Sequence, residues 1–244
     1  MARSNKDRIY ASKQDKVDKF VFDQNVAGVF QDMIERSVPG YNALNQLLPI
    51  VANQFIQENS NVYDLGCSLG EATISIANAA NGKNIVIHAV DNSSAMISQL
   101  ESRLKSLKLN ARIELLNSDV NDVDMMDGSF VILNYTLQFI DRSKRDALIS
   151  NVCSSLMNKG ALLISEKIRY DDKEEDLIMQ QLHENYKRQN DYSDMEISQK
   201  REALEDVLVR DTHEQHIERL KNAGFSKVSI LTKYLNFVSY LAIK

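Results

Sequence analysis

A glycine-bounded loop is the segment of this sequence best suited to hold a ligand. It lies in residues 62–73, VYDLGCSLGEAT, which combine a predicted strand, a tight loop and a helix start. This arrangement places backbone N–H groups in a crevice at the strand's carboxyl end, where glycine lets a ligand approach the main chain. The spacing is Gly-x-x-x-Gly, unlike the Gly-x-Gly-x-x-Gly of pyrophosphate loops, and no Gly-Lys-Ser/Thr follows. A Walker-type phosphate site is therefore excluded.

Polar side chains also stand at the carboxyl ends of the next three predicted strands. Asp91 follows Gly70 by about twenty residues, the spacing at which a carboxylate accepts hydrogen bonds from ribose hydroxyls. Asp119 can reach an adenine amino group, and Asn134 ends the fourth strand. A single Asp in such a place is more often a helix cap or a turn residue. Four consecutive strands that end in polar residues nevertheless favour a ligand site, because open α/β sheets bind ligands at this edge.

The elements that must position these residues alternate between strands and helices. Strands are predicted over 61–65, 84–90, 112–116, 129–133 and 161–165, with helices over 71–80, 94–107 and 142–157, the last stopped near Gly160. Strands joined by such helices indicate right-handed crossovers and a mainly parallel sheet. Two further strands, 227–231 and 236–242, predict a C-terminal antiparallel hairpin.

The remaining segments are predicted to be mostly helical. One helix is capped by Asp23 and a second covers 41–57. The stretch 168–225 is too long for one crossover and carries two capping boxes, Ser193…Glu196 and Thr212…Gln215. We expect a polar leader and a single domain, with its helical insertion covering the open edge of the sheet. The expected boundaries are 1–19 for the leader, 20–244 for the domain, 20–58 for the N-terminal helices and 168–225 for the insertion.

The composition excludes several classes of protein. Hydrophobic residues make up 43% and charged residues 26% of the 244 residues, values typical of globular proteins. No apolar stretch approaches the ~20 residues needed to cross a bilayer, and 1–19 has no signal-peptide core, which predicts a cytoplasmic protein without membrane contact. Two cysteines and four histidines show no metal-binding pattern, so we expect no metal. A net charge of −5 disfavours direct contact with nucleic acid.

The loop and the strand-end residues together resemble the class I S-adenosylmethionine-dependent methyltransferase fold. The matching positions are Asp64, Leu65, Gly66 and Gly70 for its first motif, Asp91 for its ribose-binding acid and Asp119 for its adenine-side acid. The resemblance implies an α/β, Rossmann-like, mainly parallel seven-stranded sheet and S-adenosyl-L-methionine as a substrate. Asn134 is followed by Tyr-Thr-Leu, which differs from the Asn/Asp-Pro-Pro-Tyr of amino-group methyltransferases, and no cysteine nucleophile stands there.

Longer segments narrow the resemblance to one family. Residues 20–41, 64–70, 133–139 and 192–201 closely resemble the carboxy-S-adenosyl-L-methionine synthases, with only 1–19 outside the resemblance. This implies conversion of S-adenosyl-L-methionine and prephenate to carboxy-S-adenosyl-L-methionine and phenylpyruvate. A tRNA carboxymethyltransferase then uses the product at the wobble uridine. The resemblance also implies a homodimer and a set of ligand contacts, which are Tyr41, Gly66, Cys67, Ser68, Asp91, Asn92, Asp119, Val120, Asn134 and Arg201.

Arg201 can also be placed by helical spacing. At 100° per residue it falls within a stripe formed by Ile197, Leu204 and Leu208. Arginine is almost never buried without a partner, and its guanidinium matches a carboxylate in a bidentate fork. From the residues alone, an internal ion pair or a solvent-reaching stem is the more common explanation. With the resemblance, Arg201 is the predicted catalytic residue that receives the new carboxylate.

The chemistry that the resemblance implies needs positioning more than a strong base. Prephenate would lose its carboxylate and ring hydroxyl together, supplying CO2 and a base that deprotonates the methyl group beside the sulfonium. The resulting ylide would capture the CO2, while the protein excludes water and supplies cations. Lys200 or Arg188 would add positive charge for the two carboxylates of prephenate. The alternatives are a conventional methyltransferase acting on RNA or a small molecule, and an idle S-adenosylmethionine-binding subunit.

Overall fold

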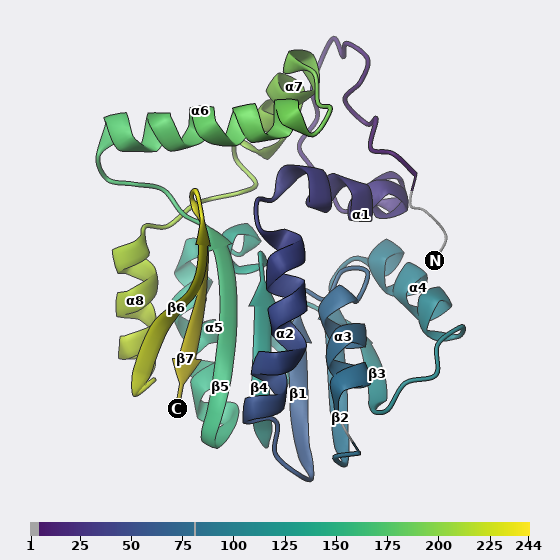
Figure 1. The fold of residues 1–244 in the computed structure, drawn as a ribbon, viewed down its shortest axis with the longest axis vertical. Coiled ribbons are helices and arrows are strands. Elements are labelled where there is room, and N and C mark those ends of the chain that lie inside the picture. The colour runs from purple at the N-terminus through teal and green to yellow at the C-terminus, as the bar shows by residue number, and fades with distance from the viewer. Residues whose placement is uncertain (1–4, 81) are drawn as a thin grey trace.

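A seven-stranded sheet forms the centre of the computed structural model, which describes residues 5–80 and 82–244 (Figure 1). Its strand order is β3-β2-β1-β4-β5-β7-β6. The first five strands pair in parallel, and β7 runs antiparallel to both β5 and β6. The strands are β1 (Ser60–Leu65), β2 (Ile85–Asp91), β3 (Arg112–Asn117), β4 (Gly128–Asn134), β5 (Leu156–Lys167), β6 (Lys227–Tyr234) and β7 (Phe237–Ile243). The predicted sheet and C-terminal hairpin are confirmed.

Helices cover both faces of this sheet, which explains the nearly continuous apolar sequence of its central strands. The helices are α1 (Gln24–Ser37), α2 (Tyr41–Phe55), α3 (Glu71–Ala79), α4 (Ser94–Leu104), α5 (Arg142–Ser155), α6 (Lys173–Gln189), α7 (Asp194–Leu204) and α8 (His213–Asn222), with 3-10 turns η1 (Val120–Asp122) and η2 (Leu137–Phe139). On one face, Leu48 of α2 and Ile76 of α3 pack with Phe130. On the other, Ile149 of α5 and Leu220 of α8 share a cluster with further sheet side chains. The core is thus divided into two layers by the sheet.

Local signals in the sequence set most of the element boundaries. Both predicted capping boxes are present, at the starts of α7 and α8. The predicted helix stop near Gly160 is wrong, because β5 begins directly after α5, where Leu156 pairs with Gly128 of β4. Gly160 therefore lies inside a strand.

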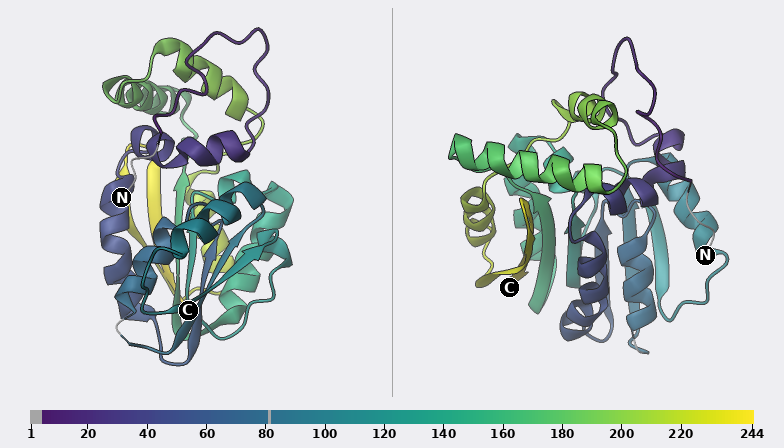
Figure 2. Two further views of the ribbon diagram at one scale, coloured as in Figure 1. Left: turned by 90° about the vertical axis from the view of Figure 1, so that its right-hand side faces the viewer. Right: turned by 45° about the horizontal axis from the view of Figure 1, so that its top comes forward.

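The N-terminal segment, α1, α6 and α7 lie above the carboxyl ends of the strands, and we call them the roof (Figure 2). The described part of the leader is bound to α7: Gln14 N donates to Gln199 Oε1 at 2.7 Å. Just beyond it, Phe20 N donates to the carbonyl of Ala203 at 2.9 Å. The expected boundary at 1–19 stays a prediction, and its first four residues lie outside the described structure. In the insertion, α8 packs beside α5 and the edge strand β6, whereas α6 reaches the carboxyl ends of the strands, where His183 packs on Phe237 of β7.

A buried ion-pair cluster anchors the insertion to the sheet. Arg145 of α5 donates to Asp211 at 2.7 Å and to the carbonyl of Val209 at 3.0 Å. Arg219 donates to the same carboxylate at 2.9 Å, and Arg145 and Asp211 are 1% and 2% exposed. Burial alone would raise the pKa of Asp211, but the hydrogen bond and charge of Arg145, with Arg219, lower it overall. The cluster holds the segment that follows α7 against the β4–α5 connection.

None of the described helices combines the length and apolar character that a bilayer span requires.

Candidate functional site

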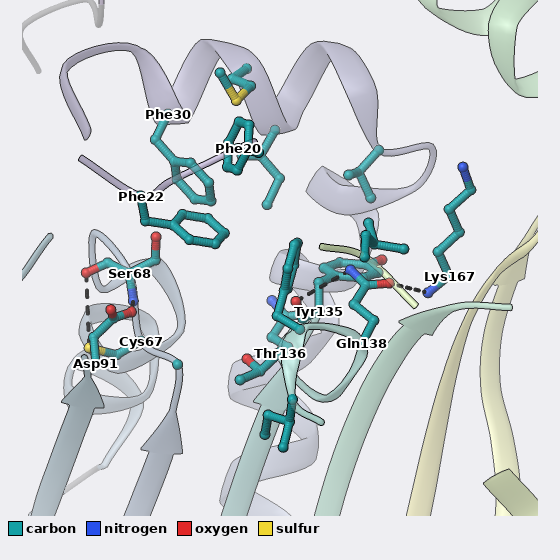
Figure 3. A pocket seen from close by; sticks show the side chains of 18 of the residues that line it. Phe20, Phe22, Phe30, Cys67, Ser68, Asp91, Tyr135, Thr136, Gln138 and Lys167 are labelled. Carbon is teal, nitrogen blue, oxygen red and sulfur yellow. Dashed lines mark hydrogen bonds between the residues drawn. The ribbon is translucent and has the colours of Figure 1, made fainter. Parts of the chain in front are cut away.

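A cavity of about 350 Å³ lies between the carboxyl ends of the strands and the roof (Figure 3). Its volume falls in the range of small-molecule sites. Nine of the ten predicted contact residues line it, namely Tyr41, Gly66, Cys67, Ser68, Asp91, Asn92, Asp119, Val120 and Asn134. The structure therefore brings these residues to one cavity, while their contact with a ligand stays a prediction.

The glycine loop is held open by backbone conformations and by two carboxylates. Gly66 has a φ of 84°, and a Cβ there would lie 2.3 Å from Thr136 Oγ1, so a larger residue does not fit. Asp91 accepts hydrogen bonds from the backbone N–H groups of Ser68 and Ser93, both at 2.9 Å. Asp64 is buried under the loop and accepts from Thr73. Burial raises the pKa of Asp64 to about 6 against the opposing effect of Thr73.

Two further polar groups in the cavity fit a ligand that donates hydrogen bonds. Asn134 Oδ1 is buried and has no partner among the described residues. Such an acceptor costs about 1–3 kcal/mol unless it is satisfied. Asp119 accepts both bonds from Asn121 through Oδ1 alone, and these bonds lower its pKa despite partial burial. The other oxygen of Asp119 remains available to an amino group.

An aromatic wall from the roof faces the loop. Phe20, Phe22 and Phe30 line the cavity, and the ring of Phe22 lies 5.2 Å from that of Phe139 and 6.1 Å from that of Phe30. Flat apolar rings of this kind suit a purine base. We did not predict these contacts, although Phe20 and Phe22 belong to a segment that carries the family resemblance.

The neutral hydroxyl and thiol groups of the cavity have no acid–base role near neutral pH. Burial raises the pKa of Tyr41 and of Tyr135 far above the usual range for tyrosine. Burial, with the charges of Asp64 and Asp91, also raises the pKa of the Cys67 thiol. Cys67 is therefore a small uncharged residue in the loop near neutral pH.

The end of the cavity opposite Asp91 is lined by amines. Lys167 rises from the end of β5 (Figure 3), and its Nζ lies 3.2 Å from Nδ1 of His183 on α6. Because Nε2 of His183 donates to the carbonyl of Ser37 at 2.7 Å, Nδ1 is the acceptor for Lys167. Lys187 and Lys200 line the same end. We call Lys167, Lys187 and Lys200 the lysine cluster.

Burial shifts the titration of the whole cluster. Burial, together with the charges of Lys187 and Arg210, lowers the pKa of Lys167 to about 7. Burial likewise lowers the pKa of Lys187 to about 8 and that of Lys200 to about 7. His183 stays neutral, because burial and the neighbouring ammonium groups hold its pKa well below the usual value.

Of the two cations proposed beside Arg201, the structure places one in the cavity. Lys200 lines it, whereas Arg188 is half-exposed and binds Asp194 and Glu184. Lys167, His183 and Lys187 were missed. Lys167 ends the fifth strand, so extending the strand-end rule by one strand would have found it. Nothing in the local sequence marks His183 or Lys187.

Arg201 lies outside the cavity lining. Its side chain is 64% exposed, and its Nη1 donates to Glu184 Oε1 at 2.9 Å. The predicted apolar stripe is wrong: the buried residues of α7 are Ile197, Gln199, Lys200 and Ala203, and Leu208 lies beyond the end of the helix. The leader packs against this helix and turns Lys200 toward the interior instead. The role of Arg201 toward a ligand stays a prediction.

Fold and site together define a class I S-adenosylmethionine-dependent methyltransferase domain. A family model described as a methyltransferase domain matches residues 62–160. The chain superposes on a putative O-methyltransferase from Nostoc punctiforme with a TM-score of 0.62 at 18% identity, covering 91% of this chain and 60% of that one. It also superposes on magnesium protoporphyrin IX methyltransferase from Synechocystis, solved with bound S-adenosylmethionine, with a TM-score of 0.57 at 14% identity, covering 97% and 88%. At such identities the likeness shows the fold alone.

Sequence relatives narrow the class further. A carboxy-S-adenosyl-L-methionine synthase from Shewanella oneidensis is 44% identical over 99% of both chains. One from Colwellia psychrerythraea is 41% identical over the full length of both. The chain belongs to the carboxy-S-adenosyl-L-methionine synthase family. The expectation that the leader falls outside the resemblance is wrong, because these alignments include it.

Within the described residues, no three His, Cys, Asp or Glu side chains gather as a metal site would require.

Proposed function

We propose that the protein converts S-adenosyl-L-methionine and prephenate to carboxy-S-adenosyl-L-methionine and phenylpyruvate in the cytoplasm. The observation that carries this proposal is the nearly full-length relationship to named synthases at 44% identity. The product would be the carboxymethyl donor for a tRNA carboxymethyltransferase that modifies the wobble uridine. The protein itself would handle only small molecules, in keeping with its net charge of −5.

The residues of the cavity fit S-adenosyl-L-methionine. Asp91 would accept hydrogen bonds from the ribose hydroxyls, with Asn92 beside it. Asp119 would accept from the adenine amino group, next to Val120 and below the aromatic wall. The unpartnered Oδ1 of Asn134 would accept from a ligand N–H group. The main chain of residues 66–68 can approach the ligand closely, because Gly66 has no Cβ.

For the expected reaction, the protein must position the two substrates, exclude water and supply positive charge. The ligands supply the chemistry themselves: an acidic methyl group beside the sulfonium, and a carboxylate that leaves as prephenate becomes aromatic. The roof would exclude bulk water once both substrates are bound, which would strengthen the charge interactions beneath it. Because the pKa values of Tyr41, Tyr135 and Cys67 are all raised, no neighbouring thiolate or phenolate competes as a base. The lysine cluster offers the cations.

In a homodimer, Arg201 would contact the ligand that is bound in the neighbouring subunit. Leu177, Ile178 and Leu182 on α6 are 54%, 46% and 42% exposed, an apolar strip that a second copy can cover. Arg201 lies beside α6 through its ion pair with Glu184. We propose that the two chains associate through α6. Arg201 would then receive the ligand carboxylate in the neighbouring subunit's cavity.

The decisive experiment is mass spectrometry of the products formed from S-adenosyl-L-methionine and prephenate. We expect equal amounts of carboxy-S-adenosyl-L-methionine and phenylpyruvate. S-adenosylhomocysteine formed with an RNA or small-molecule acceptor, without phenylpyruvate, would indicate a conventional methyltransferase. No turnover of either kind would indicate an idle binding subunit.

A further inference from the structure

The lysine cluster carries more positive charge than the protein around it neutralises. Within the described residues, only Lys200 meets a carboxylate, that of Asp7 at 3.8 Å. Lys167 contacts the neutral ring of His183, and Lys187 makes no hydrogen bond or ion pair there. All three side chains nevertheless line one cavity, and each ammonium group lowers the pKa of His183. Positive charge is thus concentrated there, and Asp7 is the one carboxylate among the described residues that pairs with any of it.

The acidic groups that face the cluster are already committed elsewhere. The charged groups around it are Asp7, Arg36, Asp176, Glu184, Arg201 and Arg210. Asp176 is held by Arg210 through two bonds of 2.9 and 3.1 Å. Glu184 is held by Arg201 and Arg188, and Asp7 also accepts a hydrogen bond from Tyr192 at 2.6 Å. None of them is free to neutralise Lys167 or Lys187.

Packing alone does not explain such a cluster. Placing like charges together in a partly dry site is unfavourable unless an anion joins them. The far end of the same cavity, at Asp91 and Asp119, is acidic and suits hydroxyl and amino groups. One cavity therefore offers a nucleoside end and an anion end. The single carboxylate of S-adenosyl-L-methionine cannot balance all of these ammonium groups, so positive charge remains for a second anion.

We propose that Lys167, Lys187 and Lys200 form the subsite of a dicarboxylate co-substrate, with Lys187 as its least constrained and most ligand-dependent cation. This assignment rests on the proposed function, since it places the second substrate of that reaction. His183 acts as a positioning residue, because its Nδ1 accepts from Lys167 while its Nε2 is fixed by Ser37. Binding of the dianion draws the lysine cluster toward the charged state, so protons are taken up on binding.

The test compares Lys187→Met with wild type in two assays. In steady-state turnover, we expect the KM for prephenate to rise about 30-fold and the KM for S-adenosyl-L-methionine to change less than about twofold, as for loss of one charge-assisted hydrogen bond. Lys187→Arg should restore most of the affinity. Lys221→Met is the matched control, because Lys221 is exposed on α8 and lies outside the cavity lining.

The second assay separates the subsite from the reaction. Prephenate is titrated calorimetrically into protein saturated with S-adenosylhomocysteine, which lacks the reactive methyl group, in two buffers of different ionisation enthalpy near pH 7.5. We expect binding with proton uptake, both reduced in Lys187→Met. Lysine-dependent binding without turnover would keep the subsite and overturn the proposed function. Turnover with an unchanged prephenate KM in Lys187→Met would overturn the subsite, and absence of both binding and turnover would overturn both.

Discussion

The two ends of the cavity are built in different ways. The nucleoside end consists of main-chain groups and acids at the ends of adjacent strands, within one continuous strand–loop–helix pattern. The lysine end takes its side chains from β5, α6 and α7, elements whose relative positions depend on the roof. The first end has protein hydrogen bonds to Asp91 that fix it without a ligand. At the lysine end, the positive charge of the lysines is not fully balanced by carboxylates of the described residues.

The two ends therefore correspond to two functions. One is shared by the fold class, and the other is particular to this protein's family. Holding a nucleoside at the strand ends is a property of the whole methyltransferase class. The choice of second substrate depends on side chains that the insertion brings over the same edge. We therefore expect changes at the two ends to affect different substrates, and the following experiments test that separation.

The largest expected effect comes from the anchor of the insertion. Asp211→Ala leaves Arg145 buried without its carboxylate partner, and we expect a loss of about 3–5 kcal/mol in the free energy of unfolding. Urea denaturation measures it. Asp146→Ala is the matched control, because Asp146 also pairs with Arg219 but is 81% exposed, and its loss should cost less than about 1 kcal/mol. Equal losses in both variants would show that the buried cluster is no anchor.

The nucleoside end should respond next. Asp91→Ala removes the acceptor for Ser68 and Ser93 and for the ribose, so the Kd for S-adenosyl-L-methionine should rise about 100-fold. Isothermal titration calorimetry measures this Kd, with the exposed Asp122→Ala as control. Prephenate affinity at saturating nucleoside should stay nearly constant. A comparable loss for prephenate would mean that the two ends are not separate.

A change of pH should affect the lysine end selectively. The pKa values of about 7 for Lys167 and Lys200 and about 8 for Lys187 mean that these ammonium groups lose their protons as pH rises from 7 to 9. The KM for prephenate should therefore rise about tenfold over this range. The KM for S-adenosyl-L-methionine should stay flat, because none of the three lysines lies at the nucleoside end. A flat prephenate profile would contradict the role given to the cluster.

Arg201 should give the smallest effect. Its ion pair with Glu184 is exposed, so Arg201→Ala should change the free energy of unfolding by less than about 1 kcal/mol. If it binds the ligand carboxylate across a dimer, the preference for carboxy-S-adenosyl-L-methionine over S-adenosyl-L-methionine should fall about fivefold, as for one exposed ion pair. The ratio of the two Kd values measures this preference. An unchanged ratio would remove Arg201 from the site.

Sequence reasoning succeeded for residues whose positions follow from the alternation of strands and helices along the chain. Gly66, Asp91, Asp119 and Asn134 follow strands of one parallel sheet, so their shared edge can be deduced from alternation alone. Arg201 was misplaced because the buried face of α7 is chosen by the leader, whose docking no local pattern announces.

Of the lysine cluster only Lys200 was predicted, and the other two lysines were missed for a similar reason. Lys187 and Lys200 lie on two helices, α6 and α7, and nothing in the chain between them fixes which helix faces meet. Lys167 alone obeys the strand-end rule, and one cation without neighbours indicates nothing specific. The cluster exists only once the roof has assembled.

The bond between Gln14 and Gln199 spans 185 residues of chain, as does that between Asp7 and Tyr192. During synthesis the leader cannot form these bonds until α7 has left the ribosome, roughly 10–40 s later at about 5–20 residues per second. Until then Phe20 lacks the carbonyl of Ala203 to which its backbone N–H donates. The finished binding cavity is thus a late product of translation, because α7 follows the five parallel strands in the chain and β6 and β7 follow α7.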